Sequence, residues 1–196
     1  MGDEIKQPRA RHVIVIAGAS SSGKTHLIGK LISPLHDAFT AKLLEHLDCR
    51  ADRRLERSTL KRMQRLIDPD STKKSKTKKL KRTLLVHVDI TSINYKASLK
   101  RLHQISQYTD RVDVITLYAD PAVWRRRITE RIHTSNEPSM RAGLIAISAT
   151  INESISNFFY HREYKKWLKE MEKLRTTKTC IANTLEKRII TSFPQE

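Results

Sequence analysis

Residues 12–25 read HVIVIAGASSSGKT, an apolar, largely β-branched run that leads directly into the pattern G-x-x-x-x-G-K-T. This pattern is the Walker A motif, and its expected setting is a buried strand before it and a helix after it. Gly18 and Gly23 allow backbone angles and close contacts that a Cβ atom would forbid. The stretch therefore predicts a strand over 12–17, a phosphate-binding turn, and a helix over 23–32.

The turn is suited to a triphosphate. Its main-chain amides would converge on phosphate oxygens at the positive end of the following helix. Lys24 can reach the β- and γ-phosphates, and the hydroxyl of Thr25 can bind Mg²⁺. The alternative is a glycine turn that arose by chance, which the flanking strand and helix patterns disfavour. The predicted nucleotide-binding residues are those of the whole motif: Gly18, Ala19, Ser20, Ser21, Ser22, Gly23, Lys24 and Thr25.

The composition describes a basic chain of single-domain size. Its 196 residues suffice for one α/β domain over residues 1–196. The formal net charge of +17 favours anionic partners, nucleic acids among them. A protein that grips several phosphates of a small substrate also needs many basic residues, so the charge alone does not decide between these partners.

Cysteine content and hydropathy bear on location. Cys49 and Cys180 are too few for a disulfide framework, which favours a reducing compartment. No apolar stretch reaches the roughly 18 residues of a membrane-spanning helix, and residues 1–11 are polar and lack the apolar segment of a secretory signal. We therefore expect a cytoplasmic protein that makes no contact with a membrane.

Strand and helix patterns alternate along the rest of the chain. Because the strands are apolar throughout, they predict a parallel sheet with helices on both faces, a three-layer α/β/α fold. Further strands are predicted over 83–89, 112–118 and 179–182, and helices over 95–107, 121–133, 142–174 (mostly helical) and 185–191.

The remaining segments are less regular. Residues 35–67 predict two helices broken near 49–51, with a short strand over 39–44 as an alternative. Residues 68–82 are rich in lysine and nearly free of apolar side chains, which predicts a mobile loop. That loop is either a solvated insertion or a grip for an anionic acceptor. Residues 1–11 are expected to form a flexible tail.

Polar residues follow several of the predicted strands. Gly18, Asp89, Asp120 and Asn183 fall at carboxyl ends, where parallel sheets collect their ligands. We expect Asp89 to serve the metal or the acceptor hydroxyl, the alternative being a turn or capping role. His87 lies two residues earlier and so on the same face of the strand, and we expect it to be structural.

The helix after Asp120 supplies candidate cations. Trp124, Ile128 and Ile132 predict its buried stripe, and the aromatic residues 158–160 are expected to dock on the same core. Two arginines one turn apart are available to a bound phosphate, and a third follows a Ser-, Asn- and Pro-containing connection. A solvated helix face is the alternative. These residues are Arg127, Arg131 and Arg141, and the segment 121–141 is the candidate lid.

Four stretches carry a family likeness: 18–25, the strand over 84–90 that ends near Asp89, the segment from residue 117 to Arg141, and 180–186. With them the chain resembles the P-loop nucleotide and metabolite kinases, and within these the guanylate-kinase-like group. The resemblance implies a P-loop NTPase fold and transfer of the γ-phosphoryl group of ATP with Mg²⁺, under a closing lid. It also implies that Lys24, Arg131 and Arg141 serve the phosphates, Thr25 and Asp89 the metal, and Arg127 and Asn183 the nucleotide.

The acceptor side departs from that group. Guanylate kinases carry a Thr-Arg-x-Pro-Arg stretch and tyrosines that hold guanosine monophosphate, whereas this chain has no tyrosine before Tyr95. The segment 35–82 instead contains a basic run with Arg50, Arg53, Arg54 and Arg57. We therefore expect a small anionic or phosphorylated acceptor other than guanosine monophosphate.

The leading interpretation is thus an ATP- and Mg²⁺-dependent phosphotransferase with a small anionic acceptor. A kinase for nucleic-acid ends, gripping its substrate through the basic loop 73–82, keeps the same fold. A nucleotide-gated binding module or NTPase is a third interpretation. A sulfotransferase shares the anion-binding loop, but the intact Gly-Lys-Thr disfavours it. ATP is preferred over GTP because the chain has no N-K-x-D pattern.

Overall fold

The computed structural model describes residues 12–49, 55–67, 83–134, 157–174 and 176–193. The predicted tail over 1–11, the loop over 68–82 and the segment 135–156 lie outside these described residues. So do Arg50, Arg53 and Arg54 of the acceptor side.

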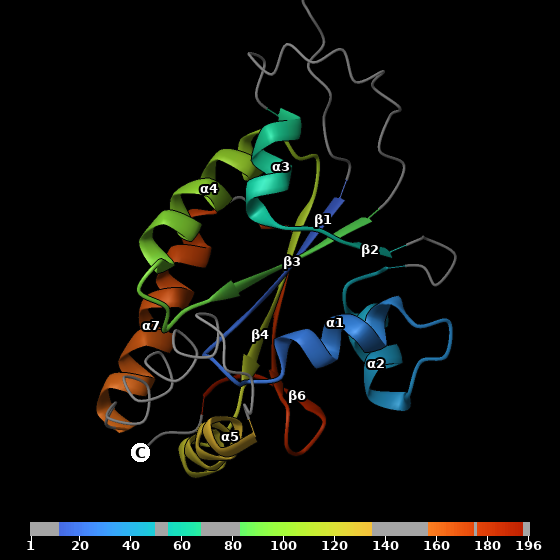
Figure 1. Ribbon diagram of the computed structural model, residues 1–196. Coiled ribbons are helices and arrows are strands. Elements are labelled where there is room, and N and C mark those ends of the chain that lie inside the picture. The colour runs from blue at the N-terminus through green and yellow to red at the C-terminus, as the bar shows by residue number, and fades with distance from the viewer. Residues whose placement is uncertain (1–11, 50–54, 68–82, 135–156, 175, 194–196) are drawn as a thin grey trace, which may run out of the picture.

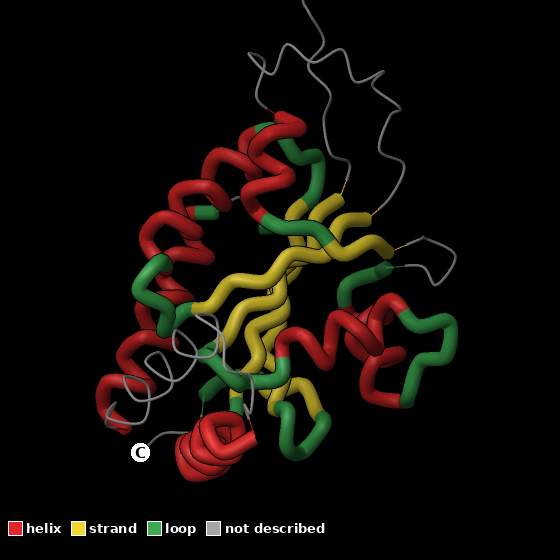
Figure 2. The backbone as a smooth tube through the Cα atoms, viewed as in Figure 1, coloured by secondary structure: helices red, strands yellow, loops and turns green. Residues whose placement is uncertain are grey.

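A six-stranded sheet forms the centre of the molecule, in the order β2-β3-β1-β4-β5-β6. The first five strands of this order run parallel, and β6 pairs antiparallel with β5. Figure 2 shows the sheet between its helices. The strands are β1 (His12–Gly18), β2 (Leu55–Arg57), β3 (Thr83–Asp89), β4 (Val112–Tyr118), β5 (Lys178–Asn183) and β6 (Arg188–Ile190).

Helices cover both faces of the sheet (Figure 1), which confirms the predicted three-layer α/β/α class. One buried cluster joins the sheet to α3, α4, α5 and α7, and a second joins the opposite face to α1 and α2. The helices are α1 (Lys24–Ile32), α2 (Ala38–His46), α3 (Leu60–Ile67), α4 (Tyr95–Gln107), α5 (Pro121–Thr134) and α7 (Asn157–Lys173).

The apolar run of β1 explains why this strand is central. Val13 and Val15 belong to the cluster under α4 and α7, whereas Ile14 and Ile16 belong to the cluster under α1 and α2. All four side chains are fully buried. Because successive side chains of a strand point to opposite faces, a strand buried on both faces is apolar over most of its length.

The structure differs from three of the sequence predictions about secondary structure. The stretch predicted as a helix over 185–191 is a turn followed by β6. In the turn, Lys187 adopts a left-handed conformation (φ 51°). Residues 39–44 are part of α2, so the alternative of a strand there is also wrong. Between α2 and α3 the chain adds the short edge strand β2, which the two-helix prediction for 35–67 did not contain.

The packing predictions for α5 and α7 hold in part. Trp124 and Ile128 are buried, as the predicted stripe requires, while the side chain of Ile132 lies outside the described residues. On α7, Tyr160 docks on the core, but Phe158 and Phe159 are 63% and 45% exposed. The prediction that all three aromatic residues dock is therefore wrong, because only Tyr160 lies on the sheet side of the helix.

Among the helices in the described parts of the chain, none combines the length and the apolar character needed to cross a lipid bilayer.

Candidate functional site

The register of the sheet brings the predicted site residues to one edge. Gly18 at the end of β1 lies beside Asp89 of β3 and Leu117 of β4, and Tyr118 lies beside Asn183 of β5. The loop over residues 18–23 follows β1 at this edge and leads into α1. The carboxyl ends of the four central strands therefore meet around the Walker A motif, as the sequence predicts.

The loop has the tight backbone that its glycines were expected to permit. A Cβ atom on Gly18 would lie 2.5 Å from Oγ of Ser22 and 2.7 Å from the carbonyl oxygen of Leu117. Gly23 and Ser21 have φ angles of 96° and 59°, in the left-handed region that glycine adopts most readily. A side chain at Gly18 would therefore push the loop away from β4.

Lys24 is the buried cation of the site. Its ammonium donates to the carbonyl oxygens of Gly18 (2.9 Å) and Ala19 (2.5 Å) and lies 3.6 Å from Oδ2 of Asp89. Only 8% of the Lys24 side chain is exposed. The Lys24 side chain thus folds back over the loop that precedes α1.

The N-terminus of α1 points its positive end at the same loop. Its N-cap residue is Gly23, no side chain caps the helix, and its first turn contains no acidic residue. Thr25, in this first turn, is exposed. Since unpaired amides and the helix dipole both favour negative charge, this end of α1 suits a phosphate group.

Asp89 is linked to the loop through Thr91. Oδ1 of Asp89 accepts hydrogen bonds from the main-chain N (3.1 Å) and the hydroxyl (3.0 Å) of Thr91. The same hydroxyl accepts a bond from the main-chain N of Ser20 (3.1 Å). Asp89 therefore has one oxygen held in place and a second that faces Lys24.

Two aromatic residues hold the other side of the loop. The hydroxyl of Tyr164 accepts a bond from the main-chain N of Ala19 (3.1 Å), and the indole N–H of Trp124 donates to the carbonyl of Ser20 (2.6 Å). The motif predicts that the amides of Ala19 and Ser20 bind a phosphate, but in this structure both donate to side chains.

Thr91, Trp124 and Tyr164 were not singled out as site residues from the sequence. Thr91 had a local signal, because a threonine two residues after an aspartate commonly closes a turn onto the carboxylate. Trp124 was predicted only as a core residue. Tyr164 lies 145 residues from Ala19 along the chain and had no local signal.

Arg127 reaches the site from α5. Its guanidinium donates to the hydroxyl of Thr184 (3.1 Å). The methyl carbon Cγ2 of Thr184 lies 4.0 Å from the position that a Cβ atom on Gly23 would take. Arg127 and the turn after β5 therefore lie beside the start of α1. The side chain of Arg131 and all of Arg141 lie outside the described residues.

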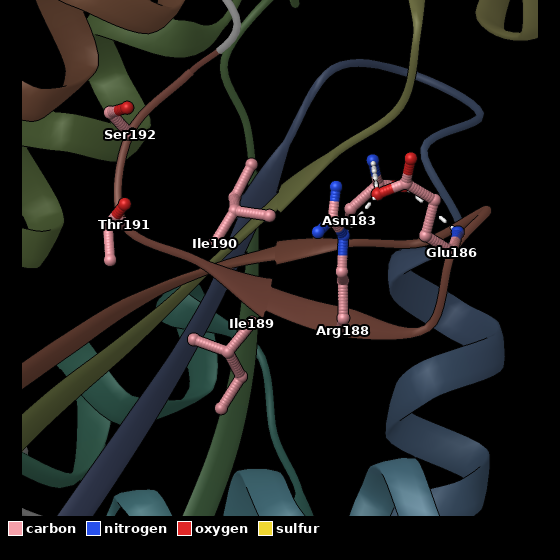
Figure 3. Close-up of a pocket in the computed structure, with 7 residues that line it drawn as sticks. All are labelled: Asn183, Glu186, Arg188, Ile189, Ile190, Thr191 and Ser192. Atoms are coloured by element: carbon pink, nitrogen blue, oxygen red, sulfur yellow. Dashed lines mark hydrogen bonds and ion pairs between the residues drawn. The ribbon is translucent and has the colours of Figure 1, made fainter.

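Asn183 shapes the turn after β5. Its Oδ1 accepts bonds from the main-chain N atoms of Leu185 (2.9 Å) and Glu186 (3.1 Å), and its Nδ2 donates to the carboxylate of Glu186 (3.1 Å). A pocket of about 430 Å³ opens here, lined by Asn183, Glu186 and residues 188–192 (Figure 3). The Asn183 side chain thus lies in the pocket wall with its polar atoms already engaged in the turn.

His87 and Arg57 lie on the other side of Asp89. The register of β2 with β3 places Arg57 on the same face as Leu85, His87 and Asp89, the face covered by α1 and α2. Partial desolvation and the nearby charges of Lys24 and Arg57 lower the pKa of His87, while Asp89 raises it. Two cationic side chains, Lys24 and Arg57, thus lie near His87, together with the carboxylate of Asp89.

The chain is similar to solved structures at low sequence identity. No protein-family model and no curated protein matches the chain. The crystal structure of APE1195 aligns with 87% of this chain and 100% of its own, at 12% identity and a TM-score of 0.40. An unliganded sugar kinase from Janibacter sp. HTCC2649 aligns with 83% of this chain and 95% of its own, at 11% identity and a TM-score of 0.33.

A shikimate kinase from Bacteroides thetaiotaomicron aligns with 82% of this chain and 98% of its own, at 14% identity and a TM-score of 0.29. Likenesses at this level leave the functional interpretation to the geometry of the site itself.

Proposed function

We propose that the chain is a P-loop kinase, an ATP- and Mg²⁺-dependent phosphotransferase whose acceptor is a small anionic molecule. One observation carries the proposal. The ammonium of Lys24 and the carboxylate of Asp89 lie 3.6 Å apart at the glycine-bounded loop where β1 meets the N-terminus of α1. A cation, a carboxylate and a helix N-terminus at one loop are the groups that phosphoryl transfer from a triphosphate requires.

The donor triphosphate would lie along the loop. Lys24 would exchange the carbonyl oxygens of Gly18 and Ala19 for phosphate oxygens, which carry full negative charge and bind an ammonium more strongly. Arg127 stands beside Thr184 and the start of α1, where it can contact the nucleotide. The turn after β5, with Asn183, is then the candidate contact for the base.

The residues present fit Mg²⁺. Thr25 offers an exposed hydroxyl, and Asp89 offers Oδ2, which does not contact Thr91 and would exchange the ammonium of Lys24 for the metal. Magnesium prefers oxygen ligands and usually keeps several waters and substrate phosphates, so one or two protein oxygens suffice. When bound, the ion would offset the charge of the phosphate oxygens.

The acceptor would approach from the side of β2. Arg57 and His87 lie on the face of the sheet that carries Asp89, and the guanidinium of Arg57 could contact an anionic acceptor there. An acceptor oxygen would attack the γ-phosphorus while the bond to the bridging oxygen breaks and ADP leaves, and an acceptor hydroxyl would release its proton to water. The protein would contribute mainly position and charge, since little covalent chemistry is required of its side chains.

A transfer assay tests the proposal. The protein is incubated with γ-labelled ATP, Mg²⁺ and a pool of metabolites, and the labelled products are identified. We expect label in a small anionic product, and no label with Lys24→Ala, a variant checked for folding by circular dichroism. Label found only in free phosphate would contradict kinase activity and favour an NTPase.

The net charge of +17 favours a second candidate, a kinase that phosphorylates nucleic-acid ends. A parallel reaction with oligonucleotides that carry free 5′ hydroxyls separates the two candidates. Labelled oligonucleotide, with binding that falls steeply as salt rises, would support this second function and overturn the small-molecule acceptor.

A further inference from the structure

The main chain of Ala19 and Ser20 is held by side chains from several elements, without any bound phosphate. Tyr164 accepts from the N–H of Ala19, and Trp124 donates to the carbonyl of Ser20. Thr91 accepts from the N–H of Ser20. These side chains come from α7, α5 and the connection after β3, so three separate elements fix one turn of the loop.

Tyr164 also ties the loop to the sheet. Its hydroxyl donates to the carbonyl oxygen of Leu117 at 2.6 Å while it accepts from Ala19. Leu117 is the β4 residue beside Gly18 and leaves no room for a Cβ atom there. Burial raises the pKa of Tyr164, so the hydroxyl keeps the proton that it donates.

The two aromatic residues belong to one packed column. The ring of Tyr160 lies 4.6 Å from Trp124 and 4.9 Å from Tyr164, measured between centroids. All three side chains are fully buried. Side chains packed in this way keep single rotamers, so the atoms that they present to the loop stay in fixed places.

We propose that Tyr164, together with Trp124, is a positioning residue that sets the main chain of the phosphate loop in the shape that receives a triphosphate. The inference rests on the proposed function, because it concerns the same nucleotide site. Its physical basis is preorganisation: a loop whose first turn is already fixed loses less conformational freedom when a ligand binds.

The test compares two buried tyrosines of α7, of which Tyr164 contacts the loop and Tyr160 contacts a carbonyl outside it. Tyr164→Phe removes the hydroxyl that contacts Ala19, whereas Tyr160→Phe removes a buried hydroxyl one helical turn earlier that donates to the carbonyl of Ala119 (2.7 Å). The hydroxyl of Tyr160 lies 3.3 Å from that of Tyr164 and makes no bond to the loop. The Kd for Mg²⁺-ATP is measured by calorimetry, and the melting temperature is recorded for each protein.

We expect Tyr164→Phe to weaken Mg²⁺-ATP binding about tenfold, because a loop that is no longer fixed loses more conformational freedom when the ligand binds. We expect Tyr160→Phe to bind within about twofold of the wild type, although the melting temperatures of both variants fall to a similar extent. Trp124→Phe, which keeps an aromatic ring but lacks the indole donor to Ser20, should also weaken binding. If Tyr164→Phe does not fold, the Kd of Trp124→Phe for Mg²⁺-ATP tests the inference in its place.

Wild-type affinity in Tyr164→Phe, or equal weakening in Tyr160→Phe, would overturn the inference and leave the proposed function intact. If Tyr164→Phe does not fold, wild-type affinity in Trp124→Phe overturns it. A wild-type protein that is folded and does not bind Mg²⁺-ATP would overturn the proposed function itself, and the inference with it.

Discussion

The ammonium of Lys24 lies 3.6 Å from Oδ2 of Asp89, although the two residues come from α1 and β3. Lys24 is 8% exposed and Asp89 28% exposed, so water screens their attraction only in part. The other oxygen of Asp89 is held by Thr91. A triphosphate would therefore compete with Asp89 for the charge of Lys24, and a metal ion would compete with Lys24 for Asp89.

Replacing Asp89 with asparagine should separate metal use from nucleotide binding. Asparagine keeps an oxygen for the Thr91 bonds but removes the charge that attracts Mg²⁺. We expect kcat to fall roughly 100-fold, with ATP still bound when magnesium is omitted. Steady-state kinetics and calorimetry with and without Mg²⁺ measure both effects. A variant with the same magnesium dependence as the wild type would show that Asp89 does not bind the metal.

Gly29 in the interior of α1 should tolerate a larger side chain. A Cβ atom there meets no heavy atom within 4 Å, and the residue has an ordinary helical conformation. Gly29→Ala should raise the free energy of unfolding by about 1 kcal/mol, because alanine loses less conformational freedom in a helix. Urea unfolding measures the gain.

Gly18→Ala is the matched contrast to that substitution. The added Cβ atom would lie 2.7 Å from the carbonyl oxygen of Leu117. The substitution should therefore lower both the free energy of unfolding and the affinity for ATP. Equal stability changes in the two variants would contradict the close contact seen at Gly18.

Much of the fold could be predicted from local patterns. The helix over 95–107 and the strand over 112–118 were predicted with the bounds of α4 and β4, because each has a clear helical period or a continuous apolar run. Residues 185–191 have apolar side chains at helical spacing, yet residues 188–190 pair with the edge of β5 instead. This pairing depends on tertiary contacts that no local window contains.

The candidate site also has one part that local sequence signals predict and one part that they do not. The loop and Asp89 could be predicted because the motif and a polar residue after an apolar strand are local signals. The side chains that hold the loop could not, because Trp124 and Tyr164 contact residues 104 and 145 positions away along the chain. Only the fold brings them to the loop.

Asp37 should stabilise α2 in two separable ways. Its Oδ1 caps the helix by accepting from the main-chain N of Thr40 (2.9 Å), and its Oδ2 pairs with Lys30 (2.5 Å). Asp37→Ala loses both contacts and should cost about 1 kcal/mol, whereas Asp37→Asn keeps the cap and should cost less than half of that. Thermal unfolding of both variants measures the difference. Equal losses would mean that the ion pair, and not the cap, stabilises the helix.

Asp113 is the centre of a buried network at the opposite end of the sheet. It is fully buried at the start of β4, and Nε2 of His12 lies 2.8 Å from its Oδ2. Arg111 donates from Nε to both carboxylate oxygens (2.9 and 3.2 Å). Burial by itself raises the pKa of Asp113, but the hydrogen bonds from His12 and Arg111 outweigh it and hold the pKa below its ordinary value.

This lowered pKa makes the contribution of Asp113 to stability depend on pH. Because the folded protein holds the carboxylate ionised more firmly than the unfolded chain does, the contribution is complete above the unfolded pKa of about 4. It is lost as the pH falls through the folded value. Asp113→Asn should therefore cost about 3 kcal/mol at pH 7, where it leaves the Arg111 charge unpaired, and less at pH 3. Urea unfolding of both proteins across this range gives the difference, and a cost that does not change with pH would show that Asp113 is not held ionised.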